Sequence, residues 1–104
     1  MTVQAPHPAL SERQFELVAK ALADPRRMAL LESIASQREY SCHRLCCEFP
    51  VSKGTISHHM KELTRAGLVH SRREGQFRFY EVRRDVLAAY TAELLRRTAH
   101  VAGG

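Results

Sequence analysis

The sequence contains no apolar run that approaches the roughly 18 residues needed for a membrane-spanning helix. Its first ten residues, MTVQAPHPAL, lack the basic flank and the apolar centre of a secretory signal. It has three cysteines, an odd number, and all of them fall within residues 42–47. Such a set is a poor disulfide framework and is typical of a reducing compartment. We therefore expect a cytoplasmic protein with no membrane partner.

The signatures of common enzymes are also missing. The chain has no nucleophile elbow, no glycine-rich phosphate loop, no paired set of carboxylates and no HExxH zinc motif. Its 104 residues suffice for one small domain and leave little room for a deep substrate pocket. Hydrophobic residues (44%) and charged residues (26%) occur in the proportions of a globular chain. We expect a single domain that is not an enzyme.

Positive charge is concentrated in one segment of the chain. Residues 1–52 carry six basic and six acidic side chains, and residues 85–104 carry two of each. The net charge of +5 therefore arises within residues 53–84. Clustered charge of this kind indicates a surface that binds a polyanion, although a solvated basic face is the alternative. The eight basic residues of the segment are Lys53, Lys61, Arg65, Arg72, Arg73, Arg78, Arg83 and Arg84.

Capping signals predict two helices in the first third of the chain. In SERQFELVAKAL, Ser11 is an N-cap and Gln14 completes a capping-box pattern. In ADPRRMALLESIAS, Asp24 is the N-cap and Pro25 takes the first helical position. Apolar residues recur at helical spacing in both segments. We treat residues 1–9 as a flexible arm that precedes them.

Two more helices and a hairpin follow. Ser41 begins a short third helix, 41–49, and Ser52 begins a fourth, 52–66. Residues 68–82 predict a β-hairpin with Gly75 at its tip. The second run of this hairpin is apolar on both alternations, so its buried face stays open: Phe77 and Phe79, or Tyr80 and Val82. A last helix is predicted over 85–100.

A helical wheel separates the two faces of the fourth helix. With about 100° per residue, Ile56, Met60 and Leu63 share one face and predict its buried side. His58 points away from that side, whereas His59 lies on the flank and is expected to pack against the preceding helix. Adjacent helical residues cannot converge on one metal ion, so a zinc site here is not expected. The outward face carries the short polar and basic groups that a helix in a DNA major groove requires.

Three stretches together resemble the ArsR/SmtB family of winged-helix repressors: ALADPRRMALLESI, VSKGTISHHMKELTRAGLV and SRREGQFRFYEV. The resemblance implies a mainly α, single-domain winged helix-turn-helix (α-α-α-α-β-β-α) over residues 10–101, with helix 52–66 as recognition helix and 68–82 as wing. It also implies a homodimer joined through its first and last helices, which binds a palindromic operator in double-stranded DNA and releases it on sensing an inducer. The residues implied to face DNA are Ser52, Lys53, Thr55, Ser57, His58, Lys61, Arg72, Arg73 and Arg78.

The inducer is suggested only by the cysteines. Cys42 and Cys46 are four residues apart on one helix, and Cys47 follows on a neighbouring face. Thiolates favour soft ions such as As(III) and can also take part in redox chemistry. The alternative is that Cys42 and Cys46 only pack in the core as small apolar side chains. The family's arsenic and cadmium sensors have Cys-x-Cys in this helix, and its zinc sensors have a histidine where this chain has Leu87.

Two other functions remain open on the sequence. One is a winged-helix module that binds proteins and never reads bases, which would expose apolar anchors over residues 52–84. The other is a repressor of the same type that senses neither metals nor thiol reagents.

Overall fold

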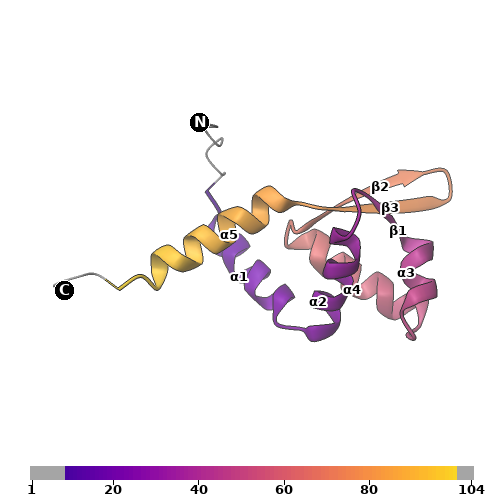
Figure 1. The fold of residues 1–104 in the computed structure, drawn as a ribbon, viewed down its shortest axis with the longest axis horizontal. Coiled ribbons are helices and arrows are strands. Elements are labelled where there is room, and N and C mark those ends of the chain that lie inside the picture. The colour runs from indigo at the N-terminus through magenta and orange to yellow at the C-terminus, as the bar shows by residue number, and fades with distance from the viewer. Residues whose placement is uncertain (1–8, 101–104) are drawn as a thin grey trace.

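The computed structural model describes residues 9–100, which form five helices and a three-stranded sheet (Figure 1). The predicted arm, 1–9, lies almost wholly outside the described residues. None of the helices in the described part is long and apolar enough to cross a membrane. In chain order the elements are α1 (Glu12–Leu22), α2 (Pro25–Ala35), β1 (Tyr40–Ser41), α3 (Cys42–Glu48), α4 (Lys53–Arg65), β2 (Val69–Glu74), β3 (Phe77–Val82) and α5 (Arg84–Arg97).

The predicted N-caps begin the first four helices. The Ser11 hydroxyl accepts a hydrogen bond from the backbone N–H of Gln14 at 3.1 Å. The Asp24 carboxylate accepts one from the N–H of Arg26 at 2.8 Å. Ser41 and Ser52 cap α3 and α4 in the same way. These bonds satisfy backbone N–H donors that the helices themselves leave unpaired. Because the bonds are local, the N-cap residues in the sequence were enough to predict where each helix begins.

The sheet differs from the predicted hairpin by one strand. β2 and β3 pair antiparallel around Gly75, whose φ of 61° is a left-handed conformation that glycine adopts without strain. A third strand, β1, pairs with β3 through Tyr40 and Ser41 and gives the order β1-β3-β2. β1 was not predicted, because two residues are too few to show an alternating pattern. The winged helix-turn-helix fold is otherwise as predicted.

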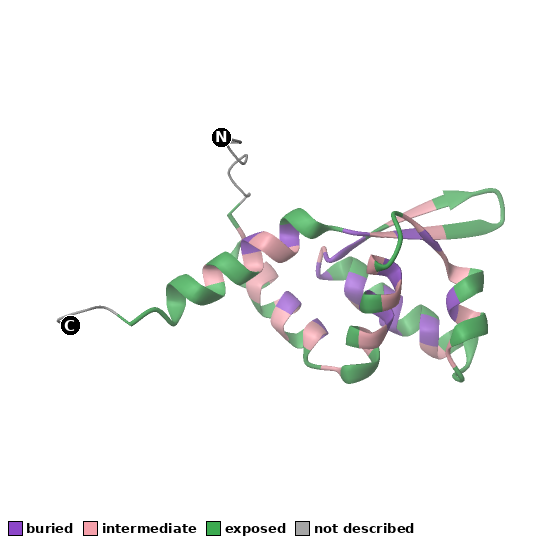
Figure 2. Cartoon of the chain, in the orientation of Figure 1, coloured by how far each residue is buried: buried purple, intermediate pink, exposed green. Residues whose placement is uncertain are grey.

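The core lies where α1, α2, α3 and α4 meet the sheet (Figure 2). The buried face of β3 carries Tyr80 and Val82, which resolves the alternation that the sequence left open. On the other alternation Phe77 is exposed and Phe79 is half-buried. The side chains that are almost completely buried come from α1, α2, α3, α4 and the turn before β2: Val18, Leu30, Ile34, Leu45, Ile56, Met60, Leu63 and Leu68.

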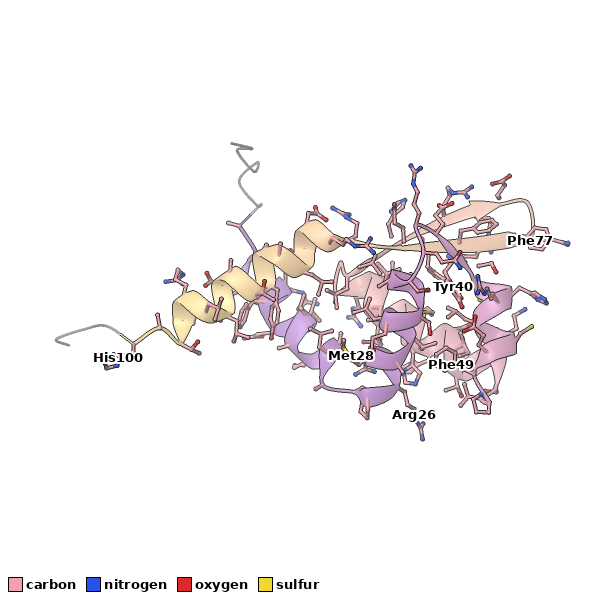
Figure 3. The ribbon with its side chains drawn as sticks, in the orientation of Figure 1. Arg26, Met28, Tyr40, Phe49, Phe77 and His100 are labelled. Atoms are coloured by element: carbon pink, nitrogen blue, oxygen red, sulfur yellow. The ribbon has the colours of Figure 1, made fainter. Side chains whose placement is uncertain are left out.

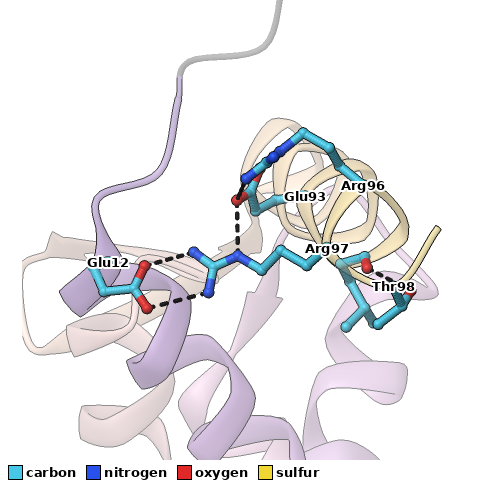
Figure 4. Close-up of polar contacts among 6 residues, drawn as sticks. Glu12, Glu93, Arg96, Arg97 and Thr98 are labelled. Carbon is cyan, nitrogen blue, oxygen red and sulfur yellow. Dashed lines mark hydrogen bonds and ion pairs between the residues drawn. The ribbon is translucent and has the colours of Figure 1, made fainter. Parts of the chain in front are cut away.

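The last helix, α5, leaves the body of the domain beside α1 (Figure 1). It ends at Arg97, three residues before the predicted end. The Arg97 guanidinium donates two hydrogen bonds to Glu12 of α1, at 3.1 and 2.6 Å, and one to Glu93 at 2.8 Å (Figure 4). It also lies 3.8 Å from the ring centroid of Phe15. The two chain-distant helices are thereby held together near the C-terminal end of α5.

Candidate nucleic-acid interface

The recognition helix predicted over 52–66 corresponds to α4, and its two faces divide as the helical wheel predicts. Ile56, Met60 and Leu63 are buried, whereas Ser57 and His58 are exposed. The adjacent rings of His58 and His59 are tilted by 55° with centroids 5.7 Å apart. One faces solvent and the other the protein interior. The two histidines therefore diverge and cannot act as a pair.

At the N-terminus of α4, the hydroxyl groups of Ser52 and Thr55 already take part in hydrogen bonds within the first turn. The Ser52 hydroxyl accepts from the N–H of Thr55 at 3.1 Å, and the two side-chain oxygens lie 2.8 Å apart. Gly54 presents no side chain here, and nothing but the Ser52 hydroxyl would come near a Cβ at that position. The first turn of α4 is consequently polar, rigidly capped and open to close approach by another molecule.

A wide groove of about 930 Å³ separates α4 from the β2–β3 hairpin. Lys53, Lys61 and Arg65 line it from α4, and Arg73 and Arg78 line it from the hairpin. No aspartate or glutamate of residues 9–100 is among its lining residues. Five cationic side chains around one open space, with no carboxylate to neutralise them, attract an anion with closely spaced charges.

The β2–β3 hairpin contributes three prominent side chains to the groove. Arg73 and Arg78 are directly opposite in the register, and Arg78 donates to the Ser71 hydroxyl at 2.8 Å. The exposed ring of Phe77 is also part of the groove and marks the hairpin tip (Figure 3). The hairpin therefore closes one side of the groove with two cations and one aromatic ring.

Arg72 lies apart from the other predicted DNA contacts. Its guanidinium donates to both Glu39 carboxylate oxygens, at 3.0 and 2.8 Å, and also pairs with Glu74. It lies 4.8 Å from the ring centroid of Phe79, and it does not line the groove. The hydrogen bonds from Arg72 hold the pKa of the Glu39 carboxyl below its ordinary value. Two carboxylates thus neutralise Arg72, and no local pattern reveals its pairing with Glu39, which is 33 residues away.

The groove therefore brings together Lys53, Ser57, Lys61, Arg73 and Arg78 from the predicted set. Ser52, Thr55 and His58 lie on α4 or at its start, outside the groove lining. Arg65 is a member that the predicted set omitted. Its position four residues after Lys61 places both side chains on one side of the helix, so spacing alone was sufficient to find it.

The cysteines divide between two surfaces. Cys42 and Cys46 are half-buried, pack against the core and also line the groove. Burial, and then the neighbouring Cys42, raises the pKa of the Cys46 thiol. Burial raises the pKa of the Tyr80 hydroxyl next to Cys42 as well. Cys47 is exposed, with its sulfur 3.7 Å from Nε2 of His43.

The separation of Cys47 from Cys42 and Cys46 affects whether the three thiols can bind a soft ion together. An As(III) or soft-metal site of three ligands needs its donors to converge on one point. In residues 9–100 no group of three or more His, Cys, Asp or Glu side chains is arranged to hold a metal ion. The cysteines of one chain therefore do not fit a three-ligand site.

Comparison with known proteins agrees with this geometry. The family described as "Bacterial regulatory protein, arsR family" matches residues 24–71. The arsenical resistance operon repressor of Staphylococcus xylosus is 32% identical over 83 residues, which cover 75% of this chain and 74% of that protein. The biofilm growth-associated repressor of Agrobacterium fabrum is 33% identical over 87 residues, covering 82% and 74%.

Solved structures give the same result. The homodimeric winged helix-turn-helix DNA-binding domain of a possible ArsR-family regulator from Mycobacterium bovis superposes with a TM-score of 0.67 at 27% identity. The match covers 90% of this chain and 93% of that one. With motifs, fold and relatives in agreement, the chain belongs to the arsR family of bacterial regulatory proteins.

Proposed function

We propose that the protein is a homodimeric transcriptional repressor that binds a palindromic operator through α4 and the hairpin wing. The observation that carries the proposal is the groove between these elements, which five cationic side chains line without a carboxylate. Its positive charge suits a DNA phosphate strand lying between a helix in the major groove and a wing beside it. The named repressors among its relatives support the same role.

The proposed contacts fall into two groups. Lys53, Lys61, Arg65, Arg73 and Arg78 bind phosphates, because their cationic side chains surround the groove. Ser57 and His58 read base edges from the exposed face of α4, and Ser52 and Thr55 contact the backbone at its N-terminus. Arg72 contributes less than the other arginines, since Glu39 and Glu74 already neutralise it. The chemistry is binding, so no catalytic step is involved.

A protein-binding module without base reading is the weaker proposal. Within residues 52–84 Phe77 is the one large apolar side chain that is strongly exposed, at 52%. Docking sites for proteins usually gather several such anchors, with charged groups at the rim. Here one ring lies among cations, which is the arrangement expected beside a sugar-phosphate backbone.

Substitutions should separate base reading from phosphate binding. Ser57→Ala or His58→Ala should reduce the preference for specific over scrambled duplex by about tenfold, because each removes a base-edge contact. Arg73→Ala should weaken both duplexes alike. Fluorescence anisotropy with DNA from upstream of its own gene and a scrambled duplex of equal length measures both affinities. Equal effects on specificity from all three substitutions would contradict the assignment.

We further propose that the repressor responds to thiol-reactive inducers through Cys42 and Cys46. The supporting observation is that both side chains line the groove assigned to DNA. A group attached to either sulfur occupies space that a phosphate strand needs. Because burial raises the pKa of Cys46, its thiolate is scarce at neutral pH, and reaction there requires a strongly thiophilic reagent.

Cysteine variants provide the test. Cys42→Ala/Cys46→Ala should bind operator DNA about as well as the wild type, yet DNA release by a thiol reagent should fall at least about tenfold. Cys47→Ala is the matched control, because Cys47 is exposed outside the groove and its loss should leave the response intact. Release is followed by anisotropy after treatment with N-ethylmaleimide or peroxide. If the double variant responds like the wild type, Cys42 and Cys46 serve packing alone.

A further inference from the structure

A second hollow lies on the inner side of α4, away from the cationic groove. It has a volume of about 280 Å³ and a wall that is almost entirely carbon. Figure 3 labels Arg26 on α2 and Phe49 after α3, two of the residues at its edge. The first turns of α2, the α3–α4 connection and the inner face of α4 line it: Pro25, Arg26, Ala29, Leu30, Phe49, Pro50, Val51, Ile56 and His59.

His59 is the polar exception in this apolar wall. Its side chain is only 6% exposed, and no group of residues 9–100 forms a hydrogen bond with its Nδ1 or Nε2. Buried polar side chains almost always have a partner, and a neutral imidazole offers one N–H donor and one acceptor nitrogen. Burial lowers the pKa of His59 and keeps the ring neutral. The hollow is thus lined by a hydrogen-bonding side chain that has no partner within the described part of the chain.

Charged side chains of both signs lie near His59. Asp24 has the largest charge effect on the ring, and Arg27, His58 and Arg26 act on it in the opposite sense. Asp24 is occupied as the N-cap of α2 and lies 3.8 Å from the Arg27 guanidinium. Across residues 9–100 no carboxylate forms an ion pair with Arg26, which lines the hollow. The free cation at the edge is therefore Arg26.

We infer that this hollow binds a compact apolar carboxylic acid, whose carboxylate accepts a hydrogen bond from the His59 N–H and faces Arg26. The aromatic or branched body of the ligand packs on Ala29, Leu30 and Ile56. The volume lies just below that of pockets for drug-sized ligands, so a single ring with one carboxyl group matches it. A rotation of the His59 ring about its Cβ–Cγ bond, a torsion with a broad energy profile, turns a nitrogen toward the ligand.

Benzoate is a suitable probe for the full chain in the absence of DNA. Titration followed by NMR of the histidine ring nitrogens should show a saturable shift at His59, with a dissociation constant of about 1 mM or tighter. Benzyl alcohol has the same ring without the charge, and it should bind at least about tenfold more weakly. Acetate, which lacks the apolar body, should give no saturable shift. Because no DNA is present, the result is independent of the proposed operator binding.

Three variants locate the site. Arg26→Gln, at the surface, should weaken benzoate binding several-fold, and Arg38→Gln is the matched control that should not. His59→Phe lacks the reporting ring, so its binding is followed by isothermal titration calorimetry beside the wild type; it should bind benzoate at least about tenfold more weakly. Ala29→Phe should fill the hollow and abolish binding, with circular dichroism to verify folding. The inference is overturned if benzoate causes no saturable shift at His59, if benzyl alcohol binds equally well, or if Arg26→Gln and His59→Phe both bind like the wild type.

Discussion

Operator binding should weaken by about a thousandfold or more when salt rises from roughly 50 to 200 mM. Each protomer places five cationic side chains around the groove, so a dimer can neutralise on the order of six to ten phosphates. Every neutralised phosphate releases counterions, and the affinity falls with a log–log slope of about −0.9 per phosphate. Anisotropy titrations at several KCl concentrations give this slope directly. A flat response would remove the electrostatic basis of the proposed function.

Two neighbouring arginines make a matched pair for this experiment. Arg73→Ala should reduce the slope by about two in the dimer, because it removes one phosphate contact from each protomer. Arg72→Ala should change the slope much less, since Glu39 and Glu74 already neutralise that guanidinium. Equal changes in slope would mean that DNA draws Arg72 away from its carboxylates on binding.

The sequence predicted the features that depend on neighbours along the chain. The caps at Ser11, Asp24, Ser41 and Ser52 were correct, because the N-cap bond joins residues two or three positions apart. The exposed face of α4 was correct for a similar reason, since a helix turns by a fixed angle per residue. These local rules were enough to place the helix starts and the two faces of α4, whereas the family was suggested by the resemblance of three stretches of sequence.

Features that depend on contacts between distant segments were not predicted from the sequence. Glu39 and Arg72 are 33 positions apart, so a predicted DNA contact turned out to be paired with a carboxylate. β1 exists only because β3 lies beside it, and its two residues show no pattern of their own. The hollow beneath α4 combines α2, the α3–α4 connection and α4. His59 was expected on the flank of the helix, packed against the preceding helix, but that its two nitrogens lack a partner within residues 9–100 is visible only in the folded structure.

A single charge on α5 should separate the two protomers. Leu94 and Leu95, in the last turn of α5 before Arg97, are 40% and 70% exposed. The C-terminal part of α5 extends past the body of the domain (Figure 1). Nearby, Phe15 of α1 and Tyr90 of α5 pack with ring centroids 4.9 Å apart, and Arg97 ties the two helices together (Figure 4). A rigid α1–α5 pair with exposed leucines is a suitable surface for a second copy of the chain.

Leu95→Asp should therefore shift the protein to monomers and weaken operator binding by at least about a hundredfold, because each half-site is then bound without its partner. The residue is exposed in the protomer, so the fold should survive, and circular dichroism checks this. Sedimentation velocity reports the oligomeric state and anisotropy the affinity. Gln37→Asp adds the same charge to an exposed loop position and should change neither. If Leu95→Asp stays dimeric, the protomers meet elsewhere; if it is monomeric yet binds the operator normally, one domain alone accounts for DNA recognition and the palindromic arrangement is wrong.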